Sequence, residues 1–168
     1  MEIKKAGIED IAIIKNLAET IWPICYKEII STEQINYMLK IMYSKLSLKE
    51  QVEKGHQFIM AYDIDIPVGY ASFSQKSEVE PRVFRLHKIY VLPNSSLKGV
   101  GTSLLDYLSN ECKKLGGTEL ELNVNKYNTA VFFYKKKNFT IVKEEVLDFG
   151  GGYVMDDYVM RCKIDDGR

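Results

Sequence analysis

The feature that most constrains the fold is a strand that leads through a glycine-containing loop directly into an amphipathic helix. Residues 82–92 have the apolar pattern of a strand, which Pro93 ends. Gly99 and Gly101 then open a helix predicted over residues 99–115. The N–H groups in the first turn of a helix have no intrahelical acceptor, and the helix dipole is positive there. The segment therefore predicts a turn that can hold an anion.

This turn does not match the two phosphate-binding motifs that are easiest to recognise. No Gly-Lys-Ser/Thr follows at the spacing of a P-loop, and Leu104 stands where G-x-G-x-x-G needs its third glycine. From the spacing alone, an ordinary strand-to-helix turn is an equally good interpretation.

The rest of the chain predicts further helices and strands. A strand at 3–6 precedes a helix from Ile11 that Trp22-Pro23 should end, and capping boxes at Ser31 and Ser47 predict two more helices. Farther on we expect strands at 57–62, 68–74, 118–124, 139–149 and 153–164, and a helix at 128–137 capped by Asn128.

These elements predict an α/β fold in one domain over residues 1–168. Hairpins join several of the strands, whereas others alternate with helices. We therefore expect a central mixed, mainly antiparallel sheet of six to seven strands with helices on both faces. A length of 168 residues fits one domain, at roughly 100–200 residues per domain.

Composition argues against several classes of protein. The 23 Lys and Arg residues balance the 23 Asp and Glu residues, which gives no electrostatic reason to expect a nucleic-acid or acidic-membrane partner. No apolar run is long enough for a membrane span, and the first residues lack the apolar core of a signal peptide. Three cysteines without CxxC spacing favour free thiols in the cytoplasm. The two histidines, His56 and His87, are not at metal-ligand spacing, so we expect no metal.

A second segment gives the glycine turn a specific meaning. Asn123-Val124-Asn125 ends a strand, and Asn128 precedes a helix that carries Ala130, Phe133-Tyr134 and then Asn138-Phe139. In this order and spacing, the two segments resemble the GNAT superfamily of acetyl-CoA-dependent N-acetyltransferases. The resemblance extends from about Gln57 to the C-terminus, and the helical first third is similar to the variable part of such proteins.

The resemblance implies acetyl-CoA as the cosubstrate and assigns residues to hold it. Ile89, Tyr90 and Val91 would contact the pantetheine arm through the strand backbone, and Asn128 would contact the same arm. The pyrophosphate would lie against the backbone of the glycine turn, which comprises Leu97, Lys98, Gly99, Val100, Gly101 and Thr102. The sequence departs from the family pattern at Ser96, where Gln or Arg is usual, and at Leu97, where Gly is frequent.

The resemblance also implies a mechanism of direct attack by a primary amine in a ternary complex. The backbone N–H of Val91 would polarise the thioester carbonyl, and Tyr134 would protonate the departing thiolate of CoA and also lie against the cofactor. Without the resemblance, Tyr134 is more simply interpreted as a core aromatic residue. The glutamates that some family members use as the general base are replaced by Arg85 and Asn123. A water relay is the favoured route for the amine proton, and His87 is the candidate side chain.

Aromatic and acidic side chains suggest a cationic acceptor, although their spacing also fits a protein core. We interpret Trp22, Tyr26 and Asp157 as substrate-binding residues. The main hypothesis is acetylation of a small molecule or polyamine. The alternatives are a protein N-terminal or lysine acetyltransferase, and a non-catalytic module that senses acetyl-CoA. The resemblance also makes a homodimer plausible.

Overall fold

The structure is a computed structural model that describes residues 1–164. Within these residues, seven strands form a sheet in the order β1-β2-β3-β4-β5-β7-β6. Strand β4 (Val83–Val91) pairs with β5 (Glu119–Asn125) in parallel, whereas β1–β2, β2–β3, β5–β7 and β6–β7 are antiparallel. The predicted mixed, mainly antiparallel sheet is thus confirmed.

The chain divides into two compact units. The first comprises Met1–Ser74 and Lys88–Leu108, and the second comprises Gln75–His87 and the described residues from Ser109 onward. Strand β4 and helix α4 (Val100–Lys114) contribute residues to both units.

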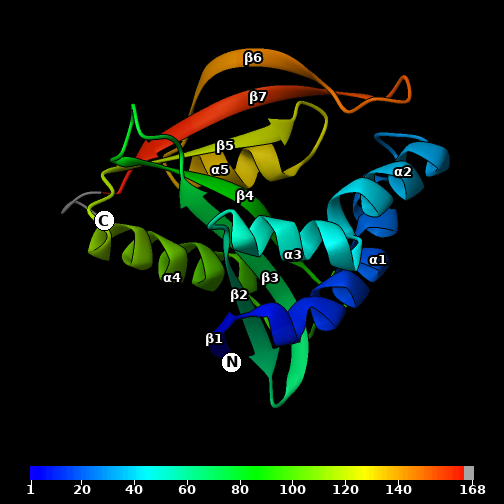
Figure 1. The fold of residues 1–168 in the computed structure, drawn as a ribbon, viewed down its shortest axis with the longest axis horizontal. Helices are drawn as coiled ribbons and strands as arrows, with labels where there is room; N and C mark the ends of the chain where they lie inside the picture. The colour runs from blue at the N-terminus through cyan, green and yellow to red at the C-terminus, as the bar shows by residue number, and fades with distance from the viewer. Residues whose placement is uncertain (165–168) are drawn as a thin grey trace. The chain divides into compact units, whose positions relative to one another are not determined.

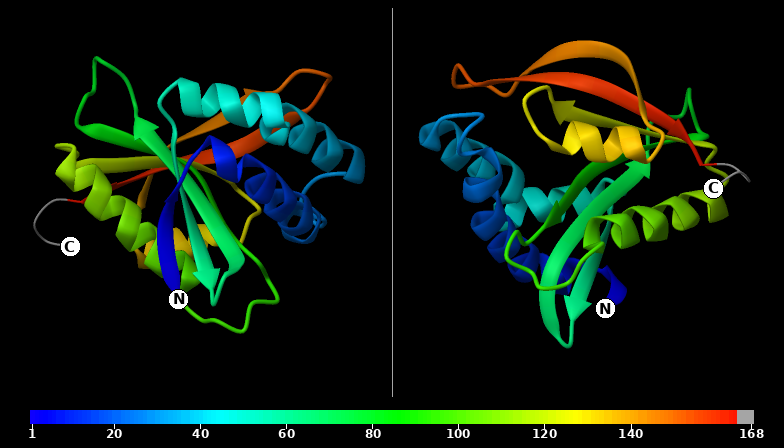
Figure 2. Two further views of the ribbon diagram at one scale, coloured as in Figure 1. Left: turned by 60° about the horizontal axis from the view of Figure 1, so that its bottom comes forward. Right: turned by 180° about the vertical axis from the view of Figure 1, so that it is seen from behind.

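The first unit begins with strand β1 (Glu2–Ala6), the short 3-10 helix η1 (Ile8–Asp10) and three α-helices (Figure 1). The helices α1 (Ile11–Tyr26), α2 (Thr32–Tyr43) and α3 (Lys45–Glu53) pack against one another. They are followed by a hairpin of β2 (Gln57–Asp63) and β3 (Ile66–Gln75), whose strands run side by side in both views of Figure 2. Its turn consists of Ile64 and Asp65, both with positive φ, as a tight two-residue hairpin requires.

Helices cover both faces of β3 in this unit. A Cβ on Gly69 would lie 3.3 Å from Leu104 and 3.4 Å from Val100, so α4 packs against the face on which Gly69 lies. The next residue, Tyr70, faces the opposite side because side chains alternate along a strand. Its ring contacts that of Tyr43 at the end of α2.

Helix α1 does not end at Trp22-Pro23, as the sequence predicted, but continues to Tyr26. Pro23 lacks the N–H that would bond to the carbonyl of residue 19. It lies on the exposed side of the helix, where water can satisfy that carbonyl. Trp22 and Tyr26 are both buried, so their packing outweighs the unfavourable helix propensity of proline.

Two smaller expectations from the sequence were also wrong. The N-cap of α3 is Ser44, whose hydroxyl accepts from the N–H of Ser47, so Ser47 lies inside the helix. The helix predicted to end at residue 115 ends at Lys114, and Leu115 beyond it is 55 % exposed. The capping interaction at Ser31 is confirmed, with its hydroxyl accepting from the N–H of Gln34.

The second unit contains β5, the short helix α5 (Ala130–Lys136) and a long hairpin of β6 (Thr140–Asp148) and β7 (Val154–Lys163), drawn in orange and red in Figure 1. The predicted cap of α5 was wrong by one residue, because the N-cap is Thr129; Asn128 precedes it, and its Oδ1 accepts from the N–H of Ala130 at 2.9 Å. Strand β6 is last in the sheet, and its register with β7 shifts between Ile141 and Lys143.

Candidate functional site

The glycine turn at the start of α4 has an open, left-handed backbone. Gly99 has a φ of +74°, and a Cβ placed on it would meet no atom within 4 Å. The amide of Ser103 donates to the Gly99 carbonyl at 2.9 Å, which begins the hydrogen-bond ladder of the helix. The amides of residues 100–102 precede this ladder and are therefore available to an anion.

The loop before this turn uses one of the predicted amides internally. The N–H of Leu97 donates to the hydroxyl of Ser95 at 3.2 Å. The side chain of Lys98 is exposed. The part of the loop that suits an anion is thus residues 98–102, one residue shorter than predicted.

Strand β4 extends beyond its pairing with β5. The parallel register covers Val83–Leu86 of β4 and Glu119–Leu122 of β5. The N–H of Leu92 donates to the carbonyl of Val68 on β3 at 2.8 Å. Gly69 permits this close approach, since a Cβ there would lie 3.0 Å from the carbonyl oxygen of Tyr90.

A buried aromatic cluster joins helices α1 and α2 to strands β3 and β4 in the first unit. The hydroxyls of Tyr26 and Tyr90 lie 2.8 Å apart, and the hydroxyl of Tyr70 donates to that of Tyr43 at 2.8 Å. Trp22 is 1 % exposed and its ring lies within 6 Å of three of these tyrosine rings, those of Tyr26, Tyr43 and Tyr90. Burial raises the pKa of Tyr43, Tyr70 and Tyr90 well above the ordinary value, so these phenols stay neutral.

Lys88 is a charged residue that the sequence analysis did not single out. It lies on β4, is 5 % exposed, and donates to Oε1 of Gln51 at 2.6 Å. Its Nζ also lies 5.5 Å from the centre of the Tyr43 ring and 5.7 Å from that of Phe58. Burial lowers its pKa to about 8. The signal in the sequence was a lysine in phase with the buried apolar residues Phe84 and Leu86 of the strand.

The second unit contains Asn128, Tyr134 and His87. Tyr134 is buried on α5, and its ring packs edge-on against those of Phe133 and Phe139. Asn128 is partly exposed, and its Oδ1 accepts from the N–H of Ala130 at the start of this helix. His87 lies on β4 with intermediate exposure.

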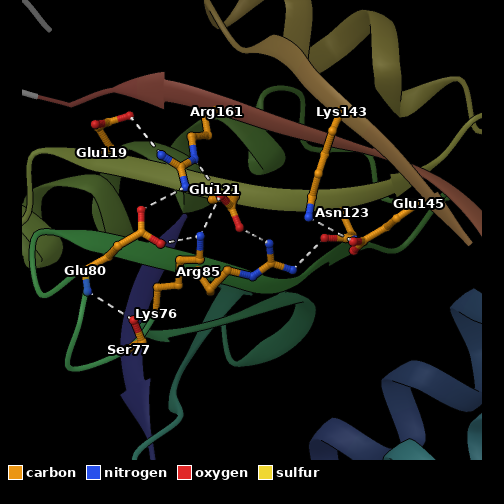
Figure 3. A network of polar contacts seen from close by, with 10 residues as sticks. All are labelled: Lys76, Ser77, Glu80, Arg85, Glu119, Glu121, Asn123, Lys143, Glu145 and Arg161. Carbon is orange, nitrogen blue, oxygen red and sulfur yellow. Dashed lines mark hydrogen bonds and ion pairs between the residues drawn. The ribbon is translucent and has the colours of Figure 1, made fainter. Parts of the chain in front are cut away.

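An ion-pair network crosses β4, β5 and β7 of the second unit (Figure 3). Glu121 is at its centre and accepts hydrogen bonds from Lys76, Arg85 and Arg161. Burial opposes ionisation of Glu121, but the bonds from Arg161 and Arg85 outweigh this effect and lower its pKa. Arg85 and Asn123, the residues expected in place of two family glutamates, bond to each other, with Arg85 donating to Asn123 at 2.6 Å.

Asp157 lies beside this network, but its negative charge is balanced much less well by hydrogen-bond donors than that of Glu121. It is 6 % exposed, and its carboxylate accepts a long hydrogen bond of 3.3 Å from the amide of Asn123. The same amide donates to Glu145 at 2.7 Å, which places two carboxylates around one donor. Burial raises the pKa of Asp157 to about 6, against the effect of Asn123 and with a further contribution from the charge of Glu145.

Within residues 1–164, no group of three or more His, Cys, Asp or Glu side chains is arranged to hold a metal ion. None of the helices in this part of the chain is long and apolar enough to cross a membrane.

Comparison with known proteins identifies similar chains and folds. Residues 26–154 match the model of the family described as acetyltransferase (GNAT) domain. The chain is 26 % identical over 155 residues to the spermidine N(1)-acetyltransferase of Thermoplasma acidophilum, covering 89 % of this chain and 94 % of that protein.

Solved structures agree with this result. PaiA N-acetyltransferase from T. acidophilum, crystallised in complex with coenzyme A, is 26 % identical, with a TM-score of 0.77 over 96 % of this chain and 98 % of that chain. A GCN5-related N-acetyltransferase from Rhodopseudomonas palustris has a TM-score of 0.80 at 18 % identity, covering 96 % and 94 %, and supports the fold alone. The chain therefore belongs to the GNAT family of acetyltransferases, enzymes that use acetyl-CoA to acetylate amines.

Proposed function

We propose that this enzyme transfers the acetyl group of acetyl-CoA to a primary amine of a polyamine, by direct attack in a ternary complex. One observation carries the proposal, namely the similarity to a spermidine N(1)-acetyltransferase over nearly the whole length of both proteins. A flexible polyamine is a polycation at neutral pH, so its recognition requires carboxylates or aromatic faces.

The glycine turn fits the diphosphate of the cosubstrate. Its amides at residues 98–102 would donate to the diphosphate oxygens, and the open space around Gly99 leaves room for them. Ile89, Tyr90 and Val91 would hold the pantetheine arm through the backbone of β4, and the family resemblance assigns Asn128 and Tyr134 to the cosubstrate as well. Acetyl-CoA supplies the acetyl group as a thioester.

Two groups of the chain would act on the thioester. The N–H of Val91 would donate to its carbonyl oxygen and stabilise the negative charge that develops there. The hydroxyl of Tyr134 would give its proton to the departing sulfur, since a phenol and a thiol have similar basicity. The proton of the attacking amine would leave through ordered water, with His87 as the candidate base.

Asp157 is the strongest candidate for the contact with a cationic acceptor. Its carboxylate is buried and, within residues 1–164, makes no ion pair with a cationic side chain, unlike Glu121. A bound ammonium group would supply the missing counter-charge. Trp22 and Tyr26 stay predicted acceptor-binding residues. Both are buried in the aromatic cluster, so little of either ring is accessible to an amine.

The first experiment is calorimetric titration with acetyl-CoA, followed by release of free thiol with a panel of amines. We expect binding of acetyl-CoA and turnover with spermidine. Peptides with a free N-terminus or a lysine would test the alternative of a protein acceptor. Turnover with those peptides but not with spermidine would overturn the polyamine assignment, and no binding of acetyl-CoA would overturn the residues assigned to the cofactor.

A further inference from the structure

Lys88 presents an unusual electrostatic situation in the first unit. Its ammonium group is buried, and in the described part of the chain it makes no ion pair with a carboxylate. Its contacts are the amide oxygen of Gln51 and the rings of Tyr43 and Phe58. A buried charge without a counter-ion destabilises a fold relative to an apolar side chain of similar size. Stability alone therefore does not account for a lysine at this position.

The partner of Lys88 is itself a junction between two helices. The amide nitrogen of Gln51 donates to the carbonyl of Met42 at 2.9 Å and to the hydroxyl of Ser47 at 3.1 Å. Met42 lies in the last turn of α2, and Ser47 and Gln51 lie in α3. Through this one carboxamide, Lys88 connects the corner between α2 and α3 to strand β4.

A second tether lies two residues farther along β4. Tyr90 is on the same face of the strand as Lys88, and its hydroxyl bonds to that of Tyr26 at the end of α1. Lys88 and Tyr90 thus hold all three N-terminal helices of the first unit. Ile89, proposed to bind the cosubstrate through its backbone, lies between them in the strand.

We propose that Lys88 is a positioning residue whose ammonium group holds the α2–α3 corner on strand β4 and thereby sets the affinity for the acceptor amine. The link to the acceptor is Tyr43, which lies under the Lys88 ammonium and packs edge-on against Trp22 at 5.8 Å. This inference rests on the proposed function, in which the helical part of the first unit contributes to acceptor binding.

The tether depends on the protonation of Lys88. The groups that face it are Tyr43 from α2, Gln51 from α3, His56 from the turn before β2 and Phe58 from β2. Burial, and then the charges of Lys88 and Lys54, lower the pKa of His56, so it is neutral when Lys88 titrates. Burial raises the pKa of Tyr43, so it stays neutral as well. With a pKa of about 8, Lys88 is charged at neutral pH and loses its proton at moderately alkaline pH.

The test compares the wild-type enzyme with Lys88→Met at a series of pH values. At pH 7 we expect the KM for spermidine to rise about tenfold in the variant, the size of a typical coupling through a packed network, with the Kd for acetyl-CoA unchanged. At each pH we divide the KM of the variant for spermidine by the KM of the wild-type enzyme. The ionisation of spermidine affects both values equally and therefore does not change this ratio. This ratio should fall toward one above pH 8, as the wild-type lysine also becomes neutral.

Two further variants separate positioning from a merely structural role. Gln51→Glu places a carboxylate beside Lys88, which raises its pKa and should move the alkaline rise in KM to higher pH. Lys49→Met removes an exposed lysine of α3 and should leave the KM for spermidine at its wild-type value at every pH. Lys88→Met should also raise the melting temperature at pH 7, because it removes a buried unpaired charge.

The outcomes distinguish the inference from the proposed function. Unchanged KM in Lys88→Met, or a KM ratio independent of pH, would overturn the role of Lys88 while the proposed function stands. If the wild-type enzyme acetylates another class of amine instead of spermidine, the polyamine assignment fails and the same ratios are measured with that amine. Absence of turnover with every amine would overturn both.

Discussion

Two buried charges, Glu121 in the second unit and Lys88 in the first, have opposite surroundings. In the second unit, the buried carboxylate of Glu121 meets three cationic side chains, and its pKa is lowered in spite of burial. In the first unit, the buried ammonium of Lys88 meets an amide and two aromatic rings, and its pKa falls to about 8.

The difference separates a buried charge that stabilises the fold from buried charges to which we assign a functional role. The Glu121 network joins three strands and leaves its central charge compensated. Lys88 and Asp157 are buried with little compensation, which costs stability in a way that only a functional gain offsets. Both belong to the parts of the chain that we connect with the acceptor amine.

The largest effect should follow a change in the glycine turn of the first unit. Gly99→Glu introduces a carboxylate and a strained left-handed side chain where the diphosphate is proposed to bind. We expect acetyl-CoA affinity to fall by about a hundredfold or more, because like charges in contact cost several kcal/mol. Calorimetry measures this loss.

Gly116→Glu is the matched control for this substitution. Gly116 has a φ of +86° with open space around it, as Gly99 has, but it follows the other end of α4. It carries the same strain and the same charge change. Equal loss of affinity in both variants would show that strain, and not the anion turn, is responsible.

The next largest effect is expected at Tyr134 in the second unit. Tyr134→Phe removes the proposed acid while keeping the ring that packs against Phe133 and Phe139. We expect kcat to fall about a hundredfold with acetyl-CoA affinity nearly unchanged. Tyr127→Phe, at an exposed tyrosine before the same helix, should have no effect. Undiminished turnover in Tyr134→Phe would leave this residue as a core aromatic.

Glu121→Gln tests how much the compensated charge of Glu121 contributes to the stability of the fold. It leaves Arg85 and Arg161 without their shared carboxylate, so the free energy of unfolding should fall by about 3 kcal/mol at pH 7. The pKa of Glu121 is lowered in the folded state, so its contribution is full above the ordinary glutamate pKa and is lost as pH falls through the lowered value. Chemical denaturation at several pH values measures both effects.

The surface pair of Glu144 and Lys126 provides the control for Glu121. The side chain of Glu144 is 62 % exposed, so Glu144→Gln should change stability by less than about 1 kcal/mol. Similar losses in the two variants would mean that the Glu121 network is no more important than a surface ion pair.

The smallest effect concerns Asp157, and here the expected sign is reversed. Its pKa is raised to about 6 in the folded state, so its contribution to stability falls as pH rises from about 4 to about 6. Asp157→Asn should therefore raise the free energy of unfolding by about 1 kcal/mol at pH 7.5 and raise the KM for spermidine. Denaturant titration and steady-state kinetics test the two expectations separately.

Asp156→Asn is the neighbouring control, since the carboxylate of Asp156 pairs with Lys126 at 2.9 Å. It should lower stability slightly and leave KM unchanged. If Asp157→Asn behaves in the same way, the carboxylate of Asp157 is compensated in solution and has no special role in acceptor binding.

The fold could be predicted from the sequence to a large extent because its signals are local. Alternation identified the strands, apolar periodicity identified the helices, and a capping serine fixed the start of α2. The errors arose where tertiary packing outweighed local preference. Burial of Trp22 and Tyr26 carried α1 through Pro23, and Ser44 capped α3 three residues before the expected serine.

The site could be predicted only where a motif marks it. The glycine turn and the strand before it are continuous in sequence, whereas Glu121 bonds to residues up to 45 positions away, the farthest being Lys76. Lys88 and Gln51 are likewise 37 positions apart. No periodicity or spacing indicates such pairs, so the roles of the charged residues became apparent only in the folded chain.

The outermost strand of the sheet has a consequence for the behaviour of the protein at high concentration. Among the strands of residues 1–164, none pairs with the outer edge of β6, and such edges invite further chains to add to them. The shift in register after Ile141 bends this edge, and Lys143, Glu144 and Glu145 place charges along it. These features act against fibril growth through β6, so a dimer formed by continuing the sheet across this edge would first have to accommodate both the bulge and the charges.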